Sequence, residues 1–193
     1  FIMDPLSKLN IEMDSSLKIA FALTKAGAQC FFTTQAGLGW HSSDKFSHAD
    51  CAEILFTNQP SSAALGIKRK LSLSNFDGVH MRKDPPFDLN YITSTWLLDA
   101  SPPTTKVINN PEALRSINEK LSIFLFREHA DTALLSANPH EILDFVIAKC
   151  DGEGIIKPLD MFGGKGVAKL SAGSKAQNVF LLAQLKKETN NGA

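Results

Sequence analysis

The N-terminal part of the chain alternates between extended and helical patterns, and this order limits the fold more than any other feature. Residues 1–3 and 29–33 are short runs rich in the aromatic and β-branched side chains that favour strands. Between them, Asp14 is a suitable N-cap for a helix over residues 15–26, which Gly27 ends. A strand, a helix and a second strand in this order predict a βαβ unit, and therefore a parallel sheet covered by helices.

A further strand, predicted at residues 79–81, leads directly into a charged loop that a double proline makes rigid. Arg82 and Lys83 begin this loop. Ligands of open α/β sheets bind just outside the carboxyl ends of the strands, and these two cations suit a carboxylate or a phosphate. The alternative is that both cations pair with the aspartates of the same loop and only shape it. A helix over residues 89–98 and a strand over residues 106–109 then continue the α/β pattern.

Residues 35–75 fit this pattern poorly. Residues 52–56 can form a strand, and residues 65–73 a short basic amphipathic element whose charge run, residues 68–70, we expect on a solvated face. The potential metal ligands in this region are His41, Asp44, His48, Asp50 and Cys51. Their spacing matches no zinc site, so we expect surface histidines in a polar loop.

A glycine-rich stretch at residues 154–170 predicts two short strands joined by a turn. Pro158 ends the pairing of the first strand, and residues 167–170 alternate between apolar and polar side chains. The turn contains Gly163, Gly164, Lys165 and Gly166. Such a turn exposes backbone N–H groups to a ligand, and a phosphate chain is the simplest one. A plain hairpin with a glycine tip is an equal alternative, because the stretch matches neither the common P-loop nor the dinucleotide fingerprint.

The rest of the second half predicts helices and one more strand. A helix is expected to open at residues 118–120, and a short strand to follow at residues 130–135. Asn138 and Glu141 resemble a capping box at the start of the next helix. The final helix is expected over residues 175–187, and its apolar positions are Val179, Leu182 and Leu185.

Composition limits the partners and the compartment. The chain has 20 basic and 20 acidic residues, which gives no whole-chain argument for nucleic acid as a partner. No apolar run approaches the roughly 20 residues that span a bilayer, and we expect no secretory signal. Its three cysteines are widely spaced and suit a reducing, cytoplasmic compartment. Because the chain begins with Phe1 in a strand-like run, we also expect a piece of a longer protein.

Several short sequence motifs occur in an order that is typical of one protein family. They are residues 3–5 (MDP), 14–16 (DSS), 81–88 (MRKDPPFD), 118–121 (NEKL) and 156–160 (IKPLD), followed by the glycine pair at 163–164. In this order they resemble prokaryotic glutathione synthetase, a family of ATP-grasp ligases, over nearly the whole chain. The block at residues 81–88 is highly specific, whereas many ATP-grasp enzymes share the glycine-rich hairpin.

The resemblance implies a fold and a reaction. The implied fold is α/β: a Rossmann-like, parallel-sheet (pre-ATP-grasp) domain at residues 1–117, then the first α+β part of an ATP-grasp domain, incomplete, at residues 118–193. The family joins γ-glutamylcysteine to glycine and forms glutathione, ADP and phosphate. ATP first phosphorylates the cysteinyl carboxylate, and the amine of glycine then attacks this acyl phosphate. Some members are tetramers, so a homo-oligomer is compatible with the resemblance.

The resemblance also implies residue roles. The residues expected to bind ATP are Lys120, Lys157, Gly163, Gly164, Lys165 and Gly166. The residues expected near the dipeptide substrate are Asp14, Ser15, Ser16 and Arg82. The Mg²⁺ ligands of the family are expected beyond residue 193, so no catalytic or metal-binding residue is assigned within the chain. The chain alone is therefore expected to bind ATP weakly and not to turn over.

One departure and two alternatives accompany this interpretation. Met161 and Phe162 precede the glycine pair where the family usually has glycine, so the turn is expected to be stiffer or differently anchored. The first alternative is another ATP-grasp ligase that joins a different carboxylate and amine, against which the block at residues 81–88 argues. The second is a non-catalytic module that binds nucleotide or a partner.

Overall fold

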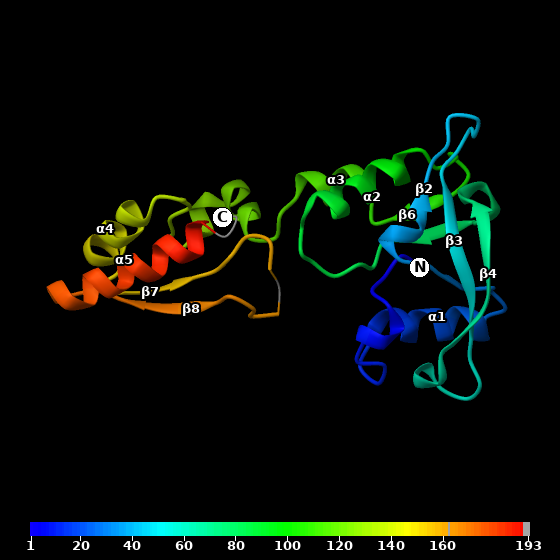
Figure 1. Ribbon diagram of the computed structural model, residues 1–193, viewed down its shortest axis with the longest axis horizontal. Helices are drawn as coiled ribbons and strands as arrows, with labels where there is room; N and C mark the ends of the chain where they lie inside the picture. The colour runs from blue at the N-terminus through cyan, green and yellow to red at the C-terminus, as the bar shows by residue number, and fades with distance from the viewer. Residues whose placement is uncertain (162, 191–193) are drawn as a thin grey trace. The chain divides into compact units, whose positions relative to one another are not determined.

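The computed structural model describes residues 1–161 and 163–190, with both α-helices and β-strands (Figure 1). The chain divides into two compact units, Phe1–Ser116 (unit 1) and Ile117–Ala193 (unit 2). Each unit has a hydrophobic core of its own, so each is described by itself. None of the described helices is long and apolar enough to cross a membrane.

Parallel pairing runs through the centre of unit 1. Ile2 pairs in parallel with Thr33 on one side and with Met81 on the other. Met81 directly follows β5 (Gly78–His80), and β5 pairs in parallel with β6 (Lys106–Ile108). The predicted parallel pairing is therefore confirmed for these segments.

The same unit also contains an antiparallel sheet, which the sequence did not predict. A long hairpin joins β3 (His48–Leu55) to β4 (Ala64–Ser72). Along the other side of β3 lie β1 (Phe31–Phe32) and β2 (Leu38–Gly39), which complete a sheet of four strands within the described residues. The expectation of a parallel sheet is thus wrong for this part of the unit, because the short connection between β3 and β4 allows only antiparallel pairing.

The region around residues 65–73 is a strand rather than an amphipathic element. β4 is an edge strand, since no strand of the described residues pairs with its outer side. The side chains of Lys68, Arg69 and Lys70 are exposed, as expected for a solvated face. A half-buried strand is identified by alternating apolar and polar side chains. Because β4 is exposed on both faces, it lacks this alternation, and the sequence did not predict a strand.

The helices of unit 1 begin where the sequence provides caps. Asp14 accepts a 2.8 Å hydrogen bond from the backbone N–H of Leu17 and caps α1 (Ser15–Lys25), as predicted. Asp88 caps α2 (Leu89–Asp99), and Asn110 caps α3 (Pro111–Ser116). Short 3₁₀ turns occupy Leu6–Lys8, Gln35–Gly37, Pro60–Ser62 and Leu73–Asn75.

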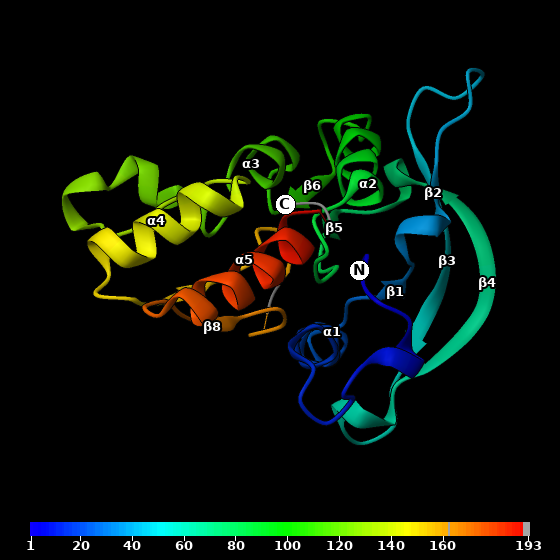
Figure 2. The ribbon, with the colours of Figure 1, turned by 60° about the vertical axis from the view of Figure 1, so that its left-hand side comes forward.

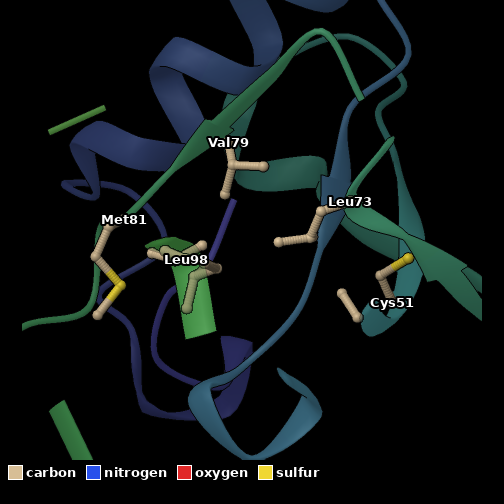
Figure 3. Packing of buried hydrophobic residues seen from close by; sticks show 7 residues of the cluster. Cys51, Leu73, Val79, Met81 and Leu98 are labelled. Atoms are coloured by element: carbon tan, nitrogen blue, oxygen red, sulfur yellow. The ribbon is translucent and has the colours of Figure 1, made fainter. Parts of the chain in front are cut away.

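The core of unit 1 lies between its helices and sheets. Figure 3 shows Val79, Met81 and Leu98 converging, with Leu73 and Cys51 beside them. The cluster of buried residues consists of Ile2, Ala49, Cys51, Leu73, Val79, Met81 and Leu98. A smaller cluster joins α1 to β1 and β3 and consists of Ala20, Cys30 and Ile54. The larger cluster combines residues from the parallel segments, from β3 and from α2, and the smaller cluster combines residues from α1 and β3. Burial of apolar surface therefore holds these segments together in one unit.

Unit 2 is an antiparallel hairpin packed against helices (Figure 1 and Figure 2). The hairpin joins β7 (Glu153–Ile156) to β8 (Ala168–Ser171) and is confirmed as predicted. The helices are α4 (Pro139–Lys149) and α5 (Lys175–Asn190), which pack against each other. The core of the unit consists of Ile142, Leu143, Val146, Leu170, Leu181 and Leu185.

Several predictions for unit 2 are wrong in detail. Residues 130–135 are exposed and irregular instead of a strand, because no described strand lies beside them to complete a ladder. The segment after residue 118 forms the 3₁₀ turns Leu121–Leu125 and Arg127–His129 rather than an α-helix. On α5, Val179 is 63% exposed, whereas Leu181 and Leu185 are buried.

The capping box predicted at the start of α4 is only half formed. Asn138 caps the helix, since its side chain accepts a 3.0 Å hydrogen bond from the backbone N–H of His140. Glu141 instead accepts a hydrogen bond from the hydroxyl of Ser136, whose oxygen in turn accepts from the backbone N–H of Asn138. A serine two residues before the cap therefore takes the place that the glutamate has in a capping box.

Candidate substrate sites

In unit 1, residues that are far apart in the sequence meet at the start of α1. The Arg82 side chain donates through Nη2 to the Ser15 hydroxyl at 2.8 Å and through Nε to the Ser16 hydroxyl at 3.2 Å. We call Ser15, Ser16 and Arg82 the serine–arginine cluster. Ser16 is buried, whereas Ser15 and Arg82 are exposed, so the guanidinium is fixed on one side and open to solvent on the other.

The backbone holds both sides of this cluster in place. The N–H of Arg82 donates to the carbonyl of Ile2 at 2.7 Å, which extends the parallel ladder to the end of the strand. On the helix side, the half-buried Asp14 fixes the first turn of α1 through its cap. All four residues expected near the dipeptide are thus brought together, with Asp14 as a cap and the others as the cluster.

The loop after Arg82 is not held by ion pairs with its own aspartates, which was the alternative considered from the sequence. The Lys83 ammonium lies 3.2 Å from the carboxylate of Asp4 and also donates to the backbone carbonyl of Asp84. Asp88, another candidate partner, instead caps α2. The sequence interpretation missed Asp4 as a partner, although Asp4 lies in the first of the family-like blocks.

His80 is a neighbour of the cluster whose protonation Arg82 affects. Burial lowers the pKa of His80 below its ordinary value of 6.5, and the guanidinium of Arg82 lowers it further. The ring of His80 stacks on Phe1 with the centroids 4.8 Å apart. His80 is therefore neutral at pH 7, and Arg82 is the charged group that an incoming anion meets at the cluster.

In unit 2, the glycine turn is the segment of residues 157–167 that joins β7 to β8. Gly163, Gly164 and Gly166 have φ of +61°, +77° and +72°, a region that side chains with a Cβ rarely adopt. Lys157 and Lys165 are exposed on the same turn. The expectation about Met161 and Phe162 is not resolved, since Phe162 lies outside the described residues.

Lys120 reaches the glycine turn from the preceding segment. Its ammonium donates to the carbonyl of Leu159 at 3.3 Å and to the carbonyl of Met161, and lies 3.6 Å from the carboxylate of Glu119. Its side chain is only 21% exposed. The structure thus places Lys120 against the turn that carries the other five residues expected to bind ATP.

Gly166 offers a direct check on the glycine turn. A Cβ at this position would lie 2.5 Å from Cγ of Pro158, whereas a Cβ at Gly164 would meet no atom within 4 Å. Both residues have positive φ, so each alanine substitution carries a backbone cost of about 1–2 kcal/mol. We expect Gly166→Ala to destabilise unit 2 by at least about 1 kcal/mol more than Gly164→Ala, because of the added overlap. Urea unfolding followed by far-UV circular dichroism measures the difference, and equal losses would contradict the close packing on Pro158.

The described residues contain no group of three or more His, Cys, Asp or Glu side chains that could hold a metal ion. Of the potential ligands between residues 41 and 51, Asp44 and His48 approach each other to 3.7 Å. Cys51 is buried in the core of unit 1 and cannot face the same site.

Comparison with known proteins identifies the family. Residues 1–115 match the family described as "Prokaryotic glutathione synthetase, N-terminal domain". The chain belongs to the prokaryotic glutathione synthetase family. The matched residues include the whole serine–arginine cluster, Asp4 and Asp14. The match ends before unit 2, so the assignment of unit 2 to an ATP-grasp domain remains a proposal.

Similar curated proteins agree with this family. The protein "Glutathione synthetase" of Ralstonia nicotianae is 35% identical over 89% of this chain and 52% of its own length. Proteins of the same name from Pseudomonas putida and Nitrosomonas europaea are 32% and 34% identical, over 93% and 88% of this chain. The chain spans about half the length of these relatives.

Proposed function

We propose that the chain serves the ATP-dependent ligation of γ-glutamylcysteine to glycine, which yields glutathione, ADP and phosphate through an acyl phosphate. The observation that carries this proposal is Arg82, held by Ser15 and Ser16 at the start of α1 within the family-matched residues. The names of the relatives point to the same reaction.

The dipeptide is proposed to bind at the serine–arginine cluster through a carboxylate. Among the residues that the structure describes, Ser15 and Ser16 are the hydrogen-bond partners of the Arg82 side chain and engage two of its five N–H groups. A carboxylate can accept two parallel hydrogen bonds from the remaining fork of a guanidinium. Asp14 caps α1 and keeps the helix end that carries Ser15 and Ser16 formed.

The phosphates of ATP are proposed to bind at the glycine turn. Lys120, Lys157 and Lys165 would neutralise phosphate charge, and the backbone N–H groups of Gly163, Gly164 and Gly166 would donate to the oxygens. Phosphoryl transfer depends mainly on positioning and charge neutralisation, which these groups can supply. A turn that closes over the phosphates would also keep water from the acyl phosphate.

Lys120 has to change partners when phosphate binds. Its ammonium is now satisfied by the carbonyls of Leu159 and Met161, so the phosphate must compete with them. The exchange favours the phosphate, because an ionised acceptor makes a stronger hydrogen bond with an ammonium than a carbonyl does. The described residues offer no group of three or more His, Cys, Asp or Glu side chains that could hold Mg²⁺.

The expected partners are small molecules, and we propose a cytoplasmic location with them. Cys30, Cys51 and Cys150 are all free thiols, which agrees with a reducing compartment.

Titration of the ¹⁵N-labelled chain tests this function. γ-Glutamylcysteine is expected to shift the backbone signals of Ser15, Ser16 and Arg82, and MgATP those of Lys120 and the glycine turn. Acetate and inorganic phosphate at the same concentrations serve as controls for simple anion binding. Turnover is not expected from the chain alone, so ADP release is measured in parallel.

Two results would contradict the proposal. The dipeptide role of the cluster would be wrong if γ-glutamylcysteine and acetate shifted the same signals of unit 1 to the same extent. A different carboxylate substrate that binds there more tightly than γ-glutamylcysteine would favour another ligase of the ATP-grasp type.

A further inference from the structure

Asn118 lies between the two stretches proposed to bind the phosphates. Its Oδ1 accepts hydrogen bonds from the backbone N–H groups of Lys120 at 2.9 Å and Leu121 at 3.2 Å. Its Nδ2 donates to the carbonyl of Leu159 at 3.3 Å, across 41 residues of sequence. One side chain therefore ties the backbone that carries Lys120 to the backbone that leads into the glycine turn.

The ammonium of Lys120 ends on the same carbonyl. Both Asn118 Nδ2 and Lys120 Nζ donate to the oxygen of Leu159, each at 3.3 Å. The lysine is thus fixed at both ends of its side chain: Asn118 holds its backbone, and the turn holds its charge. A free lysine carries up to about 2 kcal/mol of rotamer entropy, so fixing its backbone and its stem favours one placement of the charge.

We propose that Asn118 is a positioning residue of the nucleotide site, which sets Lys120 against the glycine turn so that the ammonium meets a phosphate there. This inference rests on the ATP-binding role proposed above. Asn118 itself touches no phosphate. It acts through the backbone of Lys120 and through the carbonyl of Leu159.

The chemistry of the contacts requires an amide at this position. The backbone N–H groups of Lys120 and Leu121 need an acceptor, and the carbonyl of Leu159 needs a donor. Aspartate would supply the acceptor but no donor, and its charge would repel a phosphate. Serine is too short to reach from the N–H groups to Leu159. Asparagine alone among the short side chains supplies both groups at once.

The test compares MgATP affinity among variants of the full 193-residue chain. Asn118→Ala is expected to weaken MgATP binding by about 5- to 10-fold, the loss that corresponds to about 1–1.4 kcal/mol for the lost network. Asn118→Ser keeps an acceptor for the N–H of Lys120 but loses the tie to Leu159, and is expected to weaken binding by about 3-fold or more. Lys120→Met is the reference for losing the phosphate contact itself.

Asn138→Ala is the matched control. Asn138 also accepts a hydrogen bond from a backbone N–H at a helix start in unit 2, but it caps α4 and makes no hydrogen bond to the glycine turn among the described residues. Its replacement is expected to lower stability while leaving the affinity for MgATP within about 2-fold of the original chain. Hydrogen exchange at the amides of Lys120 and Leu121 reports the local effect: faster in Asn118→Ala, nearly unchanged in Asn138→Ala.

Each outcome decides between the two proposals. If Lys120→Met weakens MgATP binding and the Asn118 variants do not, the positioning role is wrong and the ATP site stands. If Asn138→Ala weakens binding as much as Asn118→Ala, the effect is one of general stability, and the positioning role is again wrong. If Lys120→Met binds MgATP as tightly as the original chain, the ATP role of Lys120 fails and this inference fails with it.

Discussion

Replacing Leu98 by alanine is expected to lower the free energy of unfolding of unit 1 by about 3–5 kcal/mol. Leu98 is 1% exposed and packs among Ile2, Val79 and Met81 in the core of the unit. The substitution removes buried methyl groups and leaves a cavity that strands on either side cannot fill without breaking their ladders. A loss of this size is a large share of the stability of a domain of this length.

The control for this change lies on the same helix. Leu89, in the first turn of α2, is 69% exposed, so Leu89→Ala is expected to change stability by no more than about 0.5 kcal/mol. Urea unfolding followed by tryptophan fluorescence suits the comparison, because the chain's two tryptophans, Trp40 and Trp96, both belong to unit 1. Similar losses for the two variants would mean that Leu98 is not a core residue.

Replacing Arg82 by methionine is expected to weaken binding of γ-glutamylcysteine by about 10- to 100-fold. The guanidinium is already held by Ser15 and Ser16, so little entropy is lost when a carboxylate binds it. Charge-assisted hydrogen bonds contribute about 1.5–3 kcal/mol, which corresponds to the expected range. Isothermal titration calorimetry measures the affinity. Arg82→Lys keeps the charge without the planar fork, so its affinity for γ-glutamylcysteine is expected to lie between those of the original chain and Arg82→Met.

Arg69→Met is the control that distinguishes a direct contact of Arg82 with the dipeptide from an effect of net charge. Arg69 is exposed on β4, and its replacement removes the same charge from the same unit. Its affinity for γ-glutamylcysteine is expected to stay within about 2-fold of the original, because Arg69 lies outside the serine–arginine cluster and salt screens exposed charges. An equal loss in both variants would show that the dipeptide responds to net charge rather than to Arg82.

Local rules in the sequence predicted the elements that depend on neighbouring residues. The cap at Asp14 and the helix that follows it are determined within a few residues, and the hairpin of β7 and β8 by the single turn between its strands. The prediction failed where distant contacts decide. On α5, four consecutive apolar residues at 179–182 point around the helix, and only packing against α4 and β8 selects which of them are buried.

The candidate site of unit 1 could be assembled from the sequence only through the family resemblance. Ser15 and Arg82 are 67 residues apart, and no periodicity links them. The alternative in which Lys83 pairs with an aspartate of its own loop fails for a related reason, because its partner Asp4 is distant along the chain. Because Ile2 pairs in parallel with Met81, the residues two positions further, Asp4 and Lys83, lie side by side on one face of the ladder.

The exposed edge strand β4 has a consequence for the protein in concentrated solution. The chain has 20 positive and 20 negative side chains, so whole molecules repel one another only weakly. An edge strand whose outer side has no partner among the described residues, and whose Ile67 is 79% exposed, would then be a template for filament growth. The three consecutive cations at residues 68–70 oppose this, because a second copy laid along the strand brings like charges together. Salt screens that repulsion, so colloidal stability depends on ionic strength even though the molecule carries no net charge.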